Sequence, residues 1–370
     1  MRLCDKSILI ISPEPWGTNY VSKHHYAAEL AERNRVYFTG PPAWGRPFRT
    51  RPQSGESVQL LRYPHIPGLN LLPHALARPV RRLQAHWLRY LASETFDLVW
   101  SFDPFVFQDL SVFGPCLKIY HGVDLHACAW ESACVANADL ALFTSDQLLS
   151  RHATSPTPKF QVNHGLSRLL SSSQGQPVWT NHASGRAQVG LVGNLQSRLL
   201  DYDLLLQLAT DHPEADFHLI GPTGNSNLGA SERQQQLSRV LNLPNVRSWG
   251  AVHPSQLSKC YADLDVLLML YQGDKYRMEL ANPHKLMEYL STGKVTVCNY
   301  TDQYRHHRNL LVMADQQSEL PALFSRVLAR LSDYNAPEEM EKRRQFALEN
   351  TYARNISKIE GLIAGVTGRP

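Results

Sequence analysis

Residues 281–295 read ANPHKLMEYLSTGKV, and this stretch decides the fold. Pro283 suits the first position of a helix and Gly293 suits its C-terminal cap, so the pattern predicts a helix over residues 283–292. Lys285 and Glu288 are three residues apart, which places both side chains on one face near the start of that helix. A cation and a carboxylate there fit the phosphate and the ribose hydroxyls of a nucleotide. The same spacing also fits a surface ion pair, and the spacing alone leaves both interpretations open.

Buried strands and helices alternate on both sides of this helix. The run Ile-Leu-Ile-Ile at residues 8–11 is continuously apolar, which is typical of a strand covered on both faces. The strands expected in the first half are 7–12, 35–39, 97–101, 117–120 and 140–144, with a helix over about 22–33. Those expected in the second half are 187–192, 216–220, 246–249, 266–270 and 295–298, with helices over 202–210, 232–241 and 254–262 and Asp201 as an N-cap.

This alternation predicts two doubly wound α/β domains with parallel sheets. Residues 1–168 form the first domain, a polar Ser- and Gln-rich stretch at 169–186 is the linker, and residues 187–336 form the second domain. A helical tail over 337–370 completes the chain and is expected to pack back toward the first domain.

Composition supports this organisation and excludes several protein classes. The 370 residues are 43% hydrophobic and 19% charged, which excludes a disordered chain and allows about two domains. No apolar run approaches the length of a membrane span, and the apolar row at 8–11 is too short for a secretory signal. The six cysteines have no C-x-x-C spacing. We therefore expect a cytoplasmic protein with free thiols.

Positive charge is concentrated in one part of the first half. The net charge of +4 is too small to indicate a nucleic-acid partner. The segment 46–89, however, holds eight arginines against the single acid Glu56. Residues 74–94, which overlap the end of this segment, are expected to form an amphipathic basic helix that either faces the core or lies on an anionic membrane surface. The candidates for membrane contact are Arg78, Arg81, Arg82 and Trp87.

Two glycine turns follow predicted strands of the second half. Gly193 and Asn194 end the strand 187–192, and Gly221 ends the strand 216–220. A glycine at the carboxyl end of such a strand lets the backbone approach an anion, which Arg198 would help to hold. Glycines in this position are also commonly simple turn residues.

Residues 282–295 are similar to the P-x-K-x-x-E-Y-x-x-x-G-K-P-V signature of GT-B glycosyltransferases, in the large retaining group that uses nucleotide sugars. Other stretches resemble that group in the same order along the chain. They are 188–195 (QVGLVGNL), 217–222 (FHLIGP) and 245–250 (NVRSWG) in the donor domain, 160–165 (FQVNHG) at the end of the acceptor domain, and 347–354 (ALENTYAR) in the tail.

The resemblance implies a GT-B architecture, in which two Rossmann-like α/β domains face each other across a cleft. It implies that Glu288 holds the ribose hydroxyls, and that Lys285 and Arg198 neutralise the diphosphate beside Gly193. Asn194, Asn282 and Gly221 complete the expected donor site. His121 resembles the acceptor-domain histidine that faces the donor sugar, although a core histidine would have the same surroundings in sequence.

One position departs from the family pattern. Many retaining relatives carry a second acid eight residues before the one that matches Glu288, and here that position is Leu280, with Glu279 one residue away. An inverting enzyme would instead need a general base in the first domain. The acceptor-side candidates for that role are His25, Asp103 and Asp124.

The resemblance thus implies a glycosyltransferase of hexosyltransferase type that moves a sugar from a nucleoside diphosphate sugar to a hydroxyl. The expected donor is a UDP-sugar or a GDP-sugar. The acceptor is a glycan, a lipid-linked molecule or a small molecule in cell-surface polysaccharide or glycoconjugate synthesis, and retention is expected. The GT-B resemblance implies no obligatory metal. Asp263-Leu-Asp265 has the D-x-D form of a metal-binding motif, but it lies between an expected helix and a buried strand, where a cap and a strand-edge residue are expected instead. The expected place is the cytoplasm, with peripheral contact to the inner face of the membrane. The alternative is a catalytically silent GT-B subunit that binds a nucleotide sugar or a partner transferase.

Overall fold

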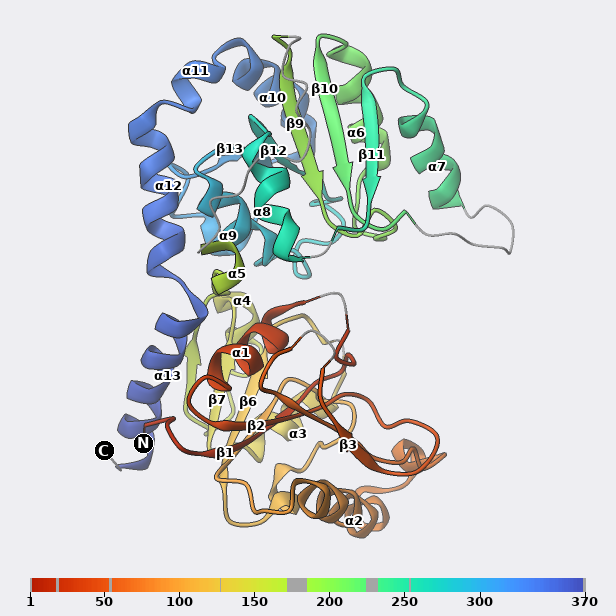
Figure 1. Cartoon of the computed structure of the whole chain (residues 1–370), viewed down its shortest axis with the longest axis vertical. Coiled ribbons are helices and arrows are strands. Elements are labelled where there is room, and N and C mark those ends of the chain that lie inside the picture. Colours follow the sequence, from red (N-terminus) through yellow and green to blue (C-terminus); the bar gives the residue numbers. More distant parts are fainter. Residues whose placement is uncertain are drawn as a thin grey trace. The chain divides into compact units, whose positions relative to one another are not determined.

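The chain folds into two compact units. The computed structural model describes residues 2–17, 20–52, 55–126, 128–171, 185–223, 232–252 and 254–368 (Figure 1). Unit 1 comprises Met1–His164 with Tyr352–Pro370, and unit 2 comprises Gly165–Thr351. Most of the linker expected at 169–186 lies outside the described residues.

Unit 1 is built on an eight-stranded sheet within the described residues. The strand order is β3-β4-β2-β1-β5-β6-β7-β8, and all pairs are parallel except β3 with β4. The strands are β1 (Ser7–Ile11), β2 (Arg35–Thr39), β3 (Phe48–Thr50), β4 (Gln59–Arg62), β5 (Leu98–Ser101), β6 (Leu117–Gly122), β7 (Leu140–Phe143) and β8 (Lys159–Gln161).

Helices cover both faces of this sheet. Ile8 and Ile10 point to the face covered by α1 (Ser22–Leu30) and α13 (Tyr352–Thr367), whereas Leu9 and Ile11 point to the face covered by α2 (His74–Ala92). This alternation explains why the first strand is apolar at every position. The remaining helices of the unit are α3 (Trp130–Ala136), α4 (Asp146–Ser150) and the 3₁₀ turns η1 (Leu69–Leu71) and η2 (Leu110–Phe113).

Unit 2 is built on a six-stranded parallel sheet of order β11-β10-β9-β12-β13-β14. Its strands are β9 (Ala187–Val192), β10 (Ala215–Ile220), β11 (Val246–Gly250), β12 (Val266–Met269), β13 (Val295–Cys298) and β14 (Val312–Met313). One face packs against α6 (Tyr202–Asp211), α7 (Glu232–Leu241) and α10 (Leu320–Ala329). The other packs against α8 (Pro254–Ala262) and α9 (Lys285–Thr292).

The expected strands and helices are present with small shifts at their ends, and Asp201 caps α6 by accepting a hydrogen bond from the Leu204 N–H at 2.9 Å. The segment 41–68, for which no strand was expected, contains β3 and β4. The helical tail consists of two helices, α12 (Pro337–Glu349) in unit 2 and α13 in unit 1, and these are separated at Asn350 and Thr351. The other short helices are α5 (Arg168–Ser171), α11 (Leu331–Tyr334), η3 (Asp302–Tyr304) and η4 (Gln317–Glu319).

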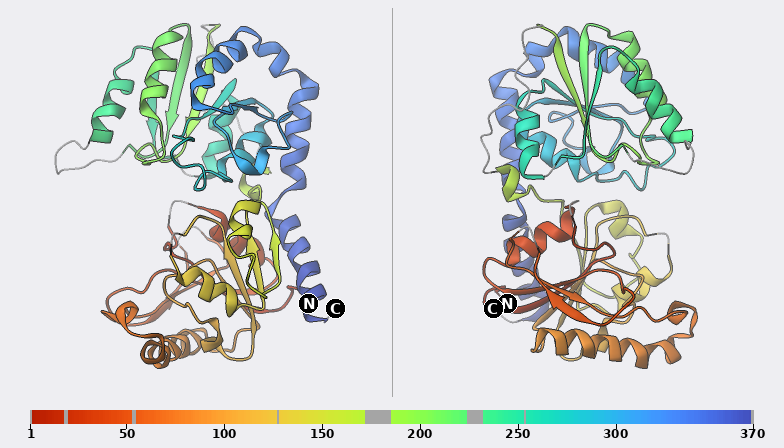
Figure 2. Two further views of the ribbon diagram at one scale, coloured as in Figure 1. Left: turned by 180° about the vertical axis from the view of Figure 1, so that it is seen from behind. Right: turned by 45° about the vertical axis from the view of Figure 1, so that its right-hand side comes forward.

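Helix α2 packs one side on the core of unit 1 and leaves part of its apolar surface exposed. The side of α2 that packs on the core carries Ala85, Leu88 and Ala92. Leu83 and Tyr90 are exposed, and α2 runs along the outside of unit 1 (Figure 2). Hydrophobic periodicity shows that a helix has an apolar side, but it does not show whether the protein covers that side. The sequence therefore left open whether this helix faces the core or a membrane surface.

Two of the proposed membrane contacts on α2 have partners within the protein. Arg81 is only 9% exposed and is therefore not a surface residue. Arg78 forms an ion pair with Asp109 at 2.8 Å. Arg82 is exposed and Trp87 is half-buried. No helix among the described residues combines the length and the apolarity needed to cross a bilayer.

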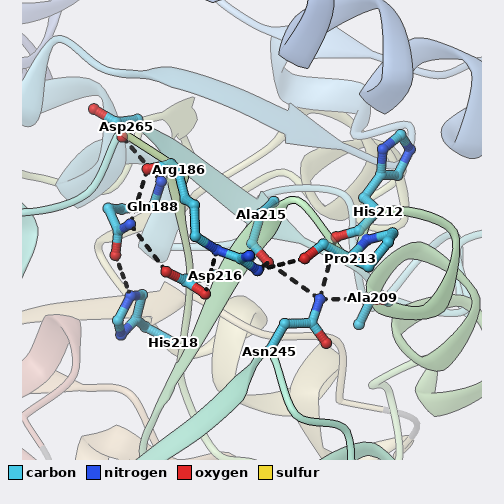
Figure 3. Close-up of polar contacts among 10 residues, drawn as sticks. All are labelled: Arg186, Gln188, Ala209, His212, Pro213, Ala215, Asp216, His218, Asn245 and Asp265. Atoms are coloured by element: carbon cyan, nitrogen blue, oxygen red, sulfur yellow. Dashed lines mark hydrogen bonds and ion pairs between the residues drawn. The ribbon is translucent and has the colours of Figure 1, made fainter. Parts of the chain in front are cut away.

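A polar network occupies the amino edge of the unit 2 sheet (Figure 3). Gln188 at the start of β9 accepts a hydrogen bond from His218 Nε2 at 2.7 Å, and its own backbone N–H donates to Asp265 at 2.9 Å. Trp249 Nε1 donates to His218 Nδ1 at 3.0 Å. The Asn245 amide donates to the carbonyl oxygens of Ala209 and His212 at the end of α6 and of Ala215 at the start of β10. These contacts join strand starts to each other and indicate a structural role for this edge.

Candidate functional site

The carboxyl edge of the unit 2 sheet holds the residues that the sequence selected. Strand β9 lies between β10 and β12, so the connections leaving β9 and β12 diverge there. In open α/β sheets this divergence forms the ligand crevice at the carboxyl ends of the strands. Gly193 directly follows β9 and Gly221 directly follows β10.

The two glycine turns are packed directly against each other. The Gly193 N–H donates to the carbonyl oxygen of Ile220 at 2.9 Å. A Cβ atom added to Gly221 would lie 1.7 Å from the Gly193 carbonyl oxygen, and Gly221 has φ +155°. No side chain fits at that distance, so Gly221 is required by the close approach of the two backbones. Around Gly193 itself a Cβ would meet nothing within 4 Å, which leaves open space beside this turn.

Helix α9 is anchored to the same edge by Tyr289. The N–H of Val192, the last residue of β9, donates to the Tyr289 hydroxyl oxygen at 2.9 Å. That hydroxyl lies 3.2 Å from the Val192 carbonyl oxygen and 3.3 Å from that of Leu268 in β12. One buried hydroxyl therefore ties α9 to both strands at the divergence. This fixes α9, which carries Lys285 and Glu288, to the strand end that precedes Gly193.

Glu288 is buried and receives two hydrogen bonds on one carboxylate oxygen. Lys285 Nζ donates to Oε2 at 2.8 Å, and the Tyr261 hydroxyl donates to the same atom at 2.9 Å. Burial raises the pKa of Glu288, but Lys285, His284 and the two hydrogen bonds outweigh it, so the pKa lies below its usual value. Glu288 is thus an anion held in place, and no described residue donates a hydrogen bond to its Oε1.

Arg198 reaches a different part of this edge. Its guanidinium lies over the Tyr276 ring at 4.7 Å and pairs with Glu279 at 3.6 Å. Asn194 is exposed, and its side chain accepts a hydrogen bond from the Gln196 N–H at 2.9 Å. Asn282 is buried just before α9. The structure thus brings Lys285 and Glu288 together, whereas Arg198 contacts the loop after β12.

Leu280 and Glu279 differ sharply in their surroundings. Leu280 is buried in the apolar interior of unit 2. Glu279, one residue earlier, is partly exposed and faces Arg198. Glu279 therefore offers a carboxylate one residue away in sequence from the position of the expected second acid.

The carboxyl edge of the unit 1 sheet holds a second set of charges. Asp103 follows β5 and accepts a hydrogen bond from the Phe105 N–H at 2.6 Å. Burial raises the pKa of Asp103 to about 6. Lys23 is also buried and pairs with Glu14, which follows β1. A carboxyl with a pKa near 6 can accept a proton at neutral pH.

The other acceptor-side candidates lie near this edge in different environments. His121, at the end of β6, is 1% exposed among the rings of Tyr26, Trp100 and Phe102. Burial lowers the pKa of His121 to about 3, so the ring is neutral. His25 is half-buried and stacks on Tyr352 at 5.1 Å.

Asp124 is exposed in the segment after β6. Among the described residues, no group of three or more His, Cys, Asp or Glu side chains is arranged to hold a metal ion. Asp265 instead accepts the Gln188 N–H at the amino edge of unit 2.

Sequence analysis missed Tyr261, Tyr289 and the pairing of the buried Lys23 with the exposed Glu14. Tyr289 was part of the quoted stretch, but its role depends on two strands that lie 21 and 97 residues away in the chain. The signal that would have drawn attention to it is a polar aromatic residue on the apolar side of an otherwise buried helix.

Comparison with solved structures shows the GT-B fold. Sucrose-phosphate synthase from Thermosynechococcus elongatus superposes with a TM-score of 0.73 at 14% identity, over 99% of this chain and 100% of that one. HepE from Anabaena in complex with UDP-glucose gives 0.68 at 14% identity, over 97% and 100%. The α,α-trehalose 6-phosphate synthase from Burkholderia multivorans gives 0.68 at 11% identity, over 99% of both chains. No protein-family model matches the chain, and no curated protein matches its sequence significantly.

Proposed function

We propose that this protein is a glycosyltransferase that moves a sugar from a nucleoside diphosphate sugar to a hydroxyl of an acceptor. The observation that carries the proposal is the buried Lys285–Glu288 pair on α9, a helix that Tyr289 ties to the carboxyl end of β9, where the glycine turn at Gly193 begins. The similarity to structures solved with UDP and UDP-glucose supports a nucleotide sugar as donor.

Within this proposal, each residue of unit 2 has a definite task. Glu288 accepts hydrogen bonds from the ribose hydroxyls through Oε1, because Oε2 already takes two donors. Lys285 supplies positive charge to the diphosphate, and the open space beside Gly193 admits the phosphate oxygens. Charge develops on that diphosphate as the glycosidic bond breaks, so fixed cations and backbone dipoles lower the barrier. Asn194, Asn282 and Gly221 shape the same site.

Arg198 is the proposed second cation for the diphosphate. It is about half exposed, and its contacts are a long ion pair to Glu279 and the face of the Tyr276 ring, so it can turn toward a ligand at a modest cost. In the same proposal Glu279 takes the place of the acid that Leu280 lacks and contacts the donor sugar. This assignment supports transfer with retention.

Unit 1 is the proposed acceptor unit. His121 provides a neutral imidazole at the edge of its sheet, and Asp103 has the pKa of a base that works at neutral pH. His25 and Asp124 are the further acceptor-side candidates. We propose a glycan, lipid-linked or small-molecule acceptor, used in cell-surface polysaccharide or glycoconjugate synthesis, with no obligatory metal.

We also propose that α2 makes peripheral contact with the inner face of the membrane. The outward-facing Leu83 and Tyr90, together with the exposed Arg82, support it, because an interfacial helix combines apolar and basic side chains. Sedimentation with anionic liposomes tests it. Binding lost in Leu83→Glu and Arg82→Glu supports membrane contact, and binding unchanged in both removes this part of the proposal.

Turnover of nucleotide sugars by the purified protein tests the main proposal. We expect release of nucleoside diphosphate from one of UDP-glucose, UDP-galactose, UDP-N-acetylglucosamine or GDP-mannose, and loss of that release in Glu288→Gln. Lys342→Met, in an exposed pair on α12, is the matched control and should keep the wild-type rate. Tight nucleotide binding without turnover would instead favour the silent GT-B subunit, to which the buried Leu280 also points.

A further inference from the structure

Unit 1 contains a cavity that none of the residues discussed for catalysis occupies. It has a volume of about 390 Å³ and lies between α2 and the segment that follows β5. Arg78 and Arg81 of α2, Asn70, Leu72 and Gln108 contribute to its wall. A second cavity of about 180 Å³ shares Arg81 and Asn70 with it.

Both cavities open among loops at the carboxyl edge of the sheet. Pro42 follows β2, His65 follows β4 and Val106 follows β5, and all three line the smaller cavity. Ligands of open α/β sheets bind at this edge. The volume of the larger cavity is within the range of small-molecule sites.

Arg81 is a buried cation that lacks a carboxylate partner. Its guanidinium donates to Gln84 Oε1 at 2.9 Å and to Asn70 Oδ1, which are both neutral. Among the described residues it forms no ion pair, and Asp103 acts on it only through space. Burying a charge is costly unless an opposite charge accompanies it. Arg78, in contrast, already pairs with Asp109 at 2.8 Å.

The lining of the cavity combines charged and apolar side chains. Asp109 also lines it and is the partner of Arg78, so Arg81 supplies the excess positive charge. Leu72 lines the cavity and is exposed, as is Leu71, which lines the smaller cavity. An excess positive charge beside exposed leucines fits a ligand with an anionic head and an apolar or sugar body.

We propose that this cavity binds a phosphate group of the acceptor, with Arg81 as the main ligand and Arg78 as the second. The proposal rests on the proposed glycosyl transfer and names the acceptor class as phosphate-bearing. A guanidinium offers two parallel donors to phosphate oxygens, and the bound phosphate supplies the countercharge that Arg81 lacks. Two sources share this chemistry, a water-soluble sugar phosphate and a prenyl phosphate whose chain lies over the leucines.

The test compares phosphate-bearing probes with their parent alcohols by titration calorimetry. The probes are glucose 6-phosphate against glucose, and farnesyl phosphate against farnesol in neutral detergent micelles. We expect wild type to bind one phosphate probe more tightly than its alcohol, and Arg81→Gln to weaken that binding about tenfold or more. Arg78→Gln should weaken it less. Which probe binds identifies the source of the phosphate.

Arg89→Gln is the matched control, because Arg89 is on the same helix but does not line either cavity. It should bind the probes as wild type does. If Arg81→Gln fails to fold, the weakening in Arg78→Gln decides the question. Equal binding by wild type and the cavity variants, or no preference for phosphate over alcohol, would overturn the proposal.

UDP titration of the same variants separates this proposal from the proposed donor site. UDP binding that persists while phosphate probes fail removes only the acceptor phosphate subsite. Phosphate binding that persists while UDP fails removes the donor assignment instead.

Discussion

Replacing Lys285 by methionine should destabilise unit 2 strongly, because Glu288 would remain buried without its cation. The two side chains are 2.8 Å apart and only 17% and 11% exposed, so solvent screens the pair little. Removing one partner of a buried ion pair typically costs about 3–5 kcal/mol. We expect Lys285→Met to lower the free energy of unfolding by about that amount at pH 7.

The pH dependence gives the sign of this effect. In wild type the folded-state pKa of Glu288 is lowered, so its charge stabilises the fold above the unfolded pKa of about 4.3 and that contribution is lost as pH falls through the folded value. In Lys285→Met, Glu288 loses the cation that lowers its pKa, so burial makes the pKa of Glu288 higher in the variant than in wild type. The difference in the free energy of unfolding between Lys285→Met and wild type should therefore be smaller at pH 4 than at pH 7.

Urea denaturation followed by circular dichroism at both pH values measures this difference. Lys342→Met removes the cation of an exposed Lys-Glu pair at the same i,i+3 spacing, and should remain close to wild type at both pH values. If Lys285→Met were as stable as Lys342→Met at pH 7, Glu288 would not be the buried, Lys-dependent anion described above.

Three further outcomes follow from the same geometry. Gly221→Ala should lower the free energy of unfolding, measured by urea denaturation, by about 3 kcal/mol or more, because the added Cβ would overlap the Gly193 carbonyl oxygen. A variant as stable as wild type would show that the two turns lie farther apart. Tyr289→Phe should cost about 1–3 kcal/mol by the same assay, since the buried Val192 N–H loses its acceptor, and an unchanged midpoint would contradict that bond. The imidazole of His121 should show no titration between pH 5 and 8 by NMR, because burial lowers its pKa to about 3, and a midpoint near 6.5 would refute its burial.

Most strands of both sheets and the helices that cover them could be predicted from the sequence, because each is indicated by a pattern within a few consecutive residues. A fully apolar strand such as β1 is recognisable from a few residues, and the helix α9 is bounded by Pro283 and by Gly293, which has φ +78°. The hairpin of β3 and β4 was missed because neither strand is a buried apolar run; β3 is exposed at all three positions.

The functional arrangement was only partly predictable because it depends on contacts distant in sequence. Lys285 and Glu288 were selected from their spacing, which also fixes their distance. The anchoring by Tyr289, and the outward orientation of α2 that buries Arg81, depend on which other elements cover those helices. The residue pattern of a single helix does not show which other elements of the fold will cover it.

Titration calorimetry with UDP, GDP, TDP and CMP tests the central claim most directly. The account predicts that the wild-type protein binds one nucleoside diphosphate selectively, and that Glu288→Ala weakens this binding at least about tenfold by removing the acceptor of the ribose hydroxyls. Wild-type protein that binds none of the four, or Glu288→Ala that binds the preferred nucleotide as tightly as wild type, would contradict it.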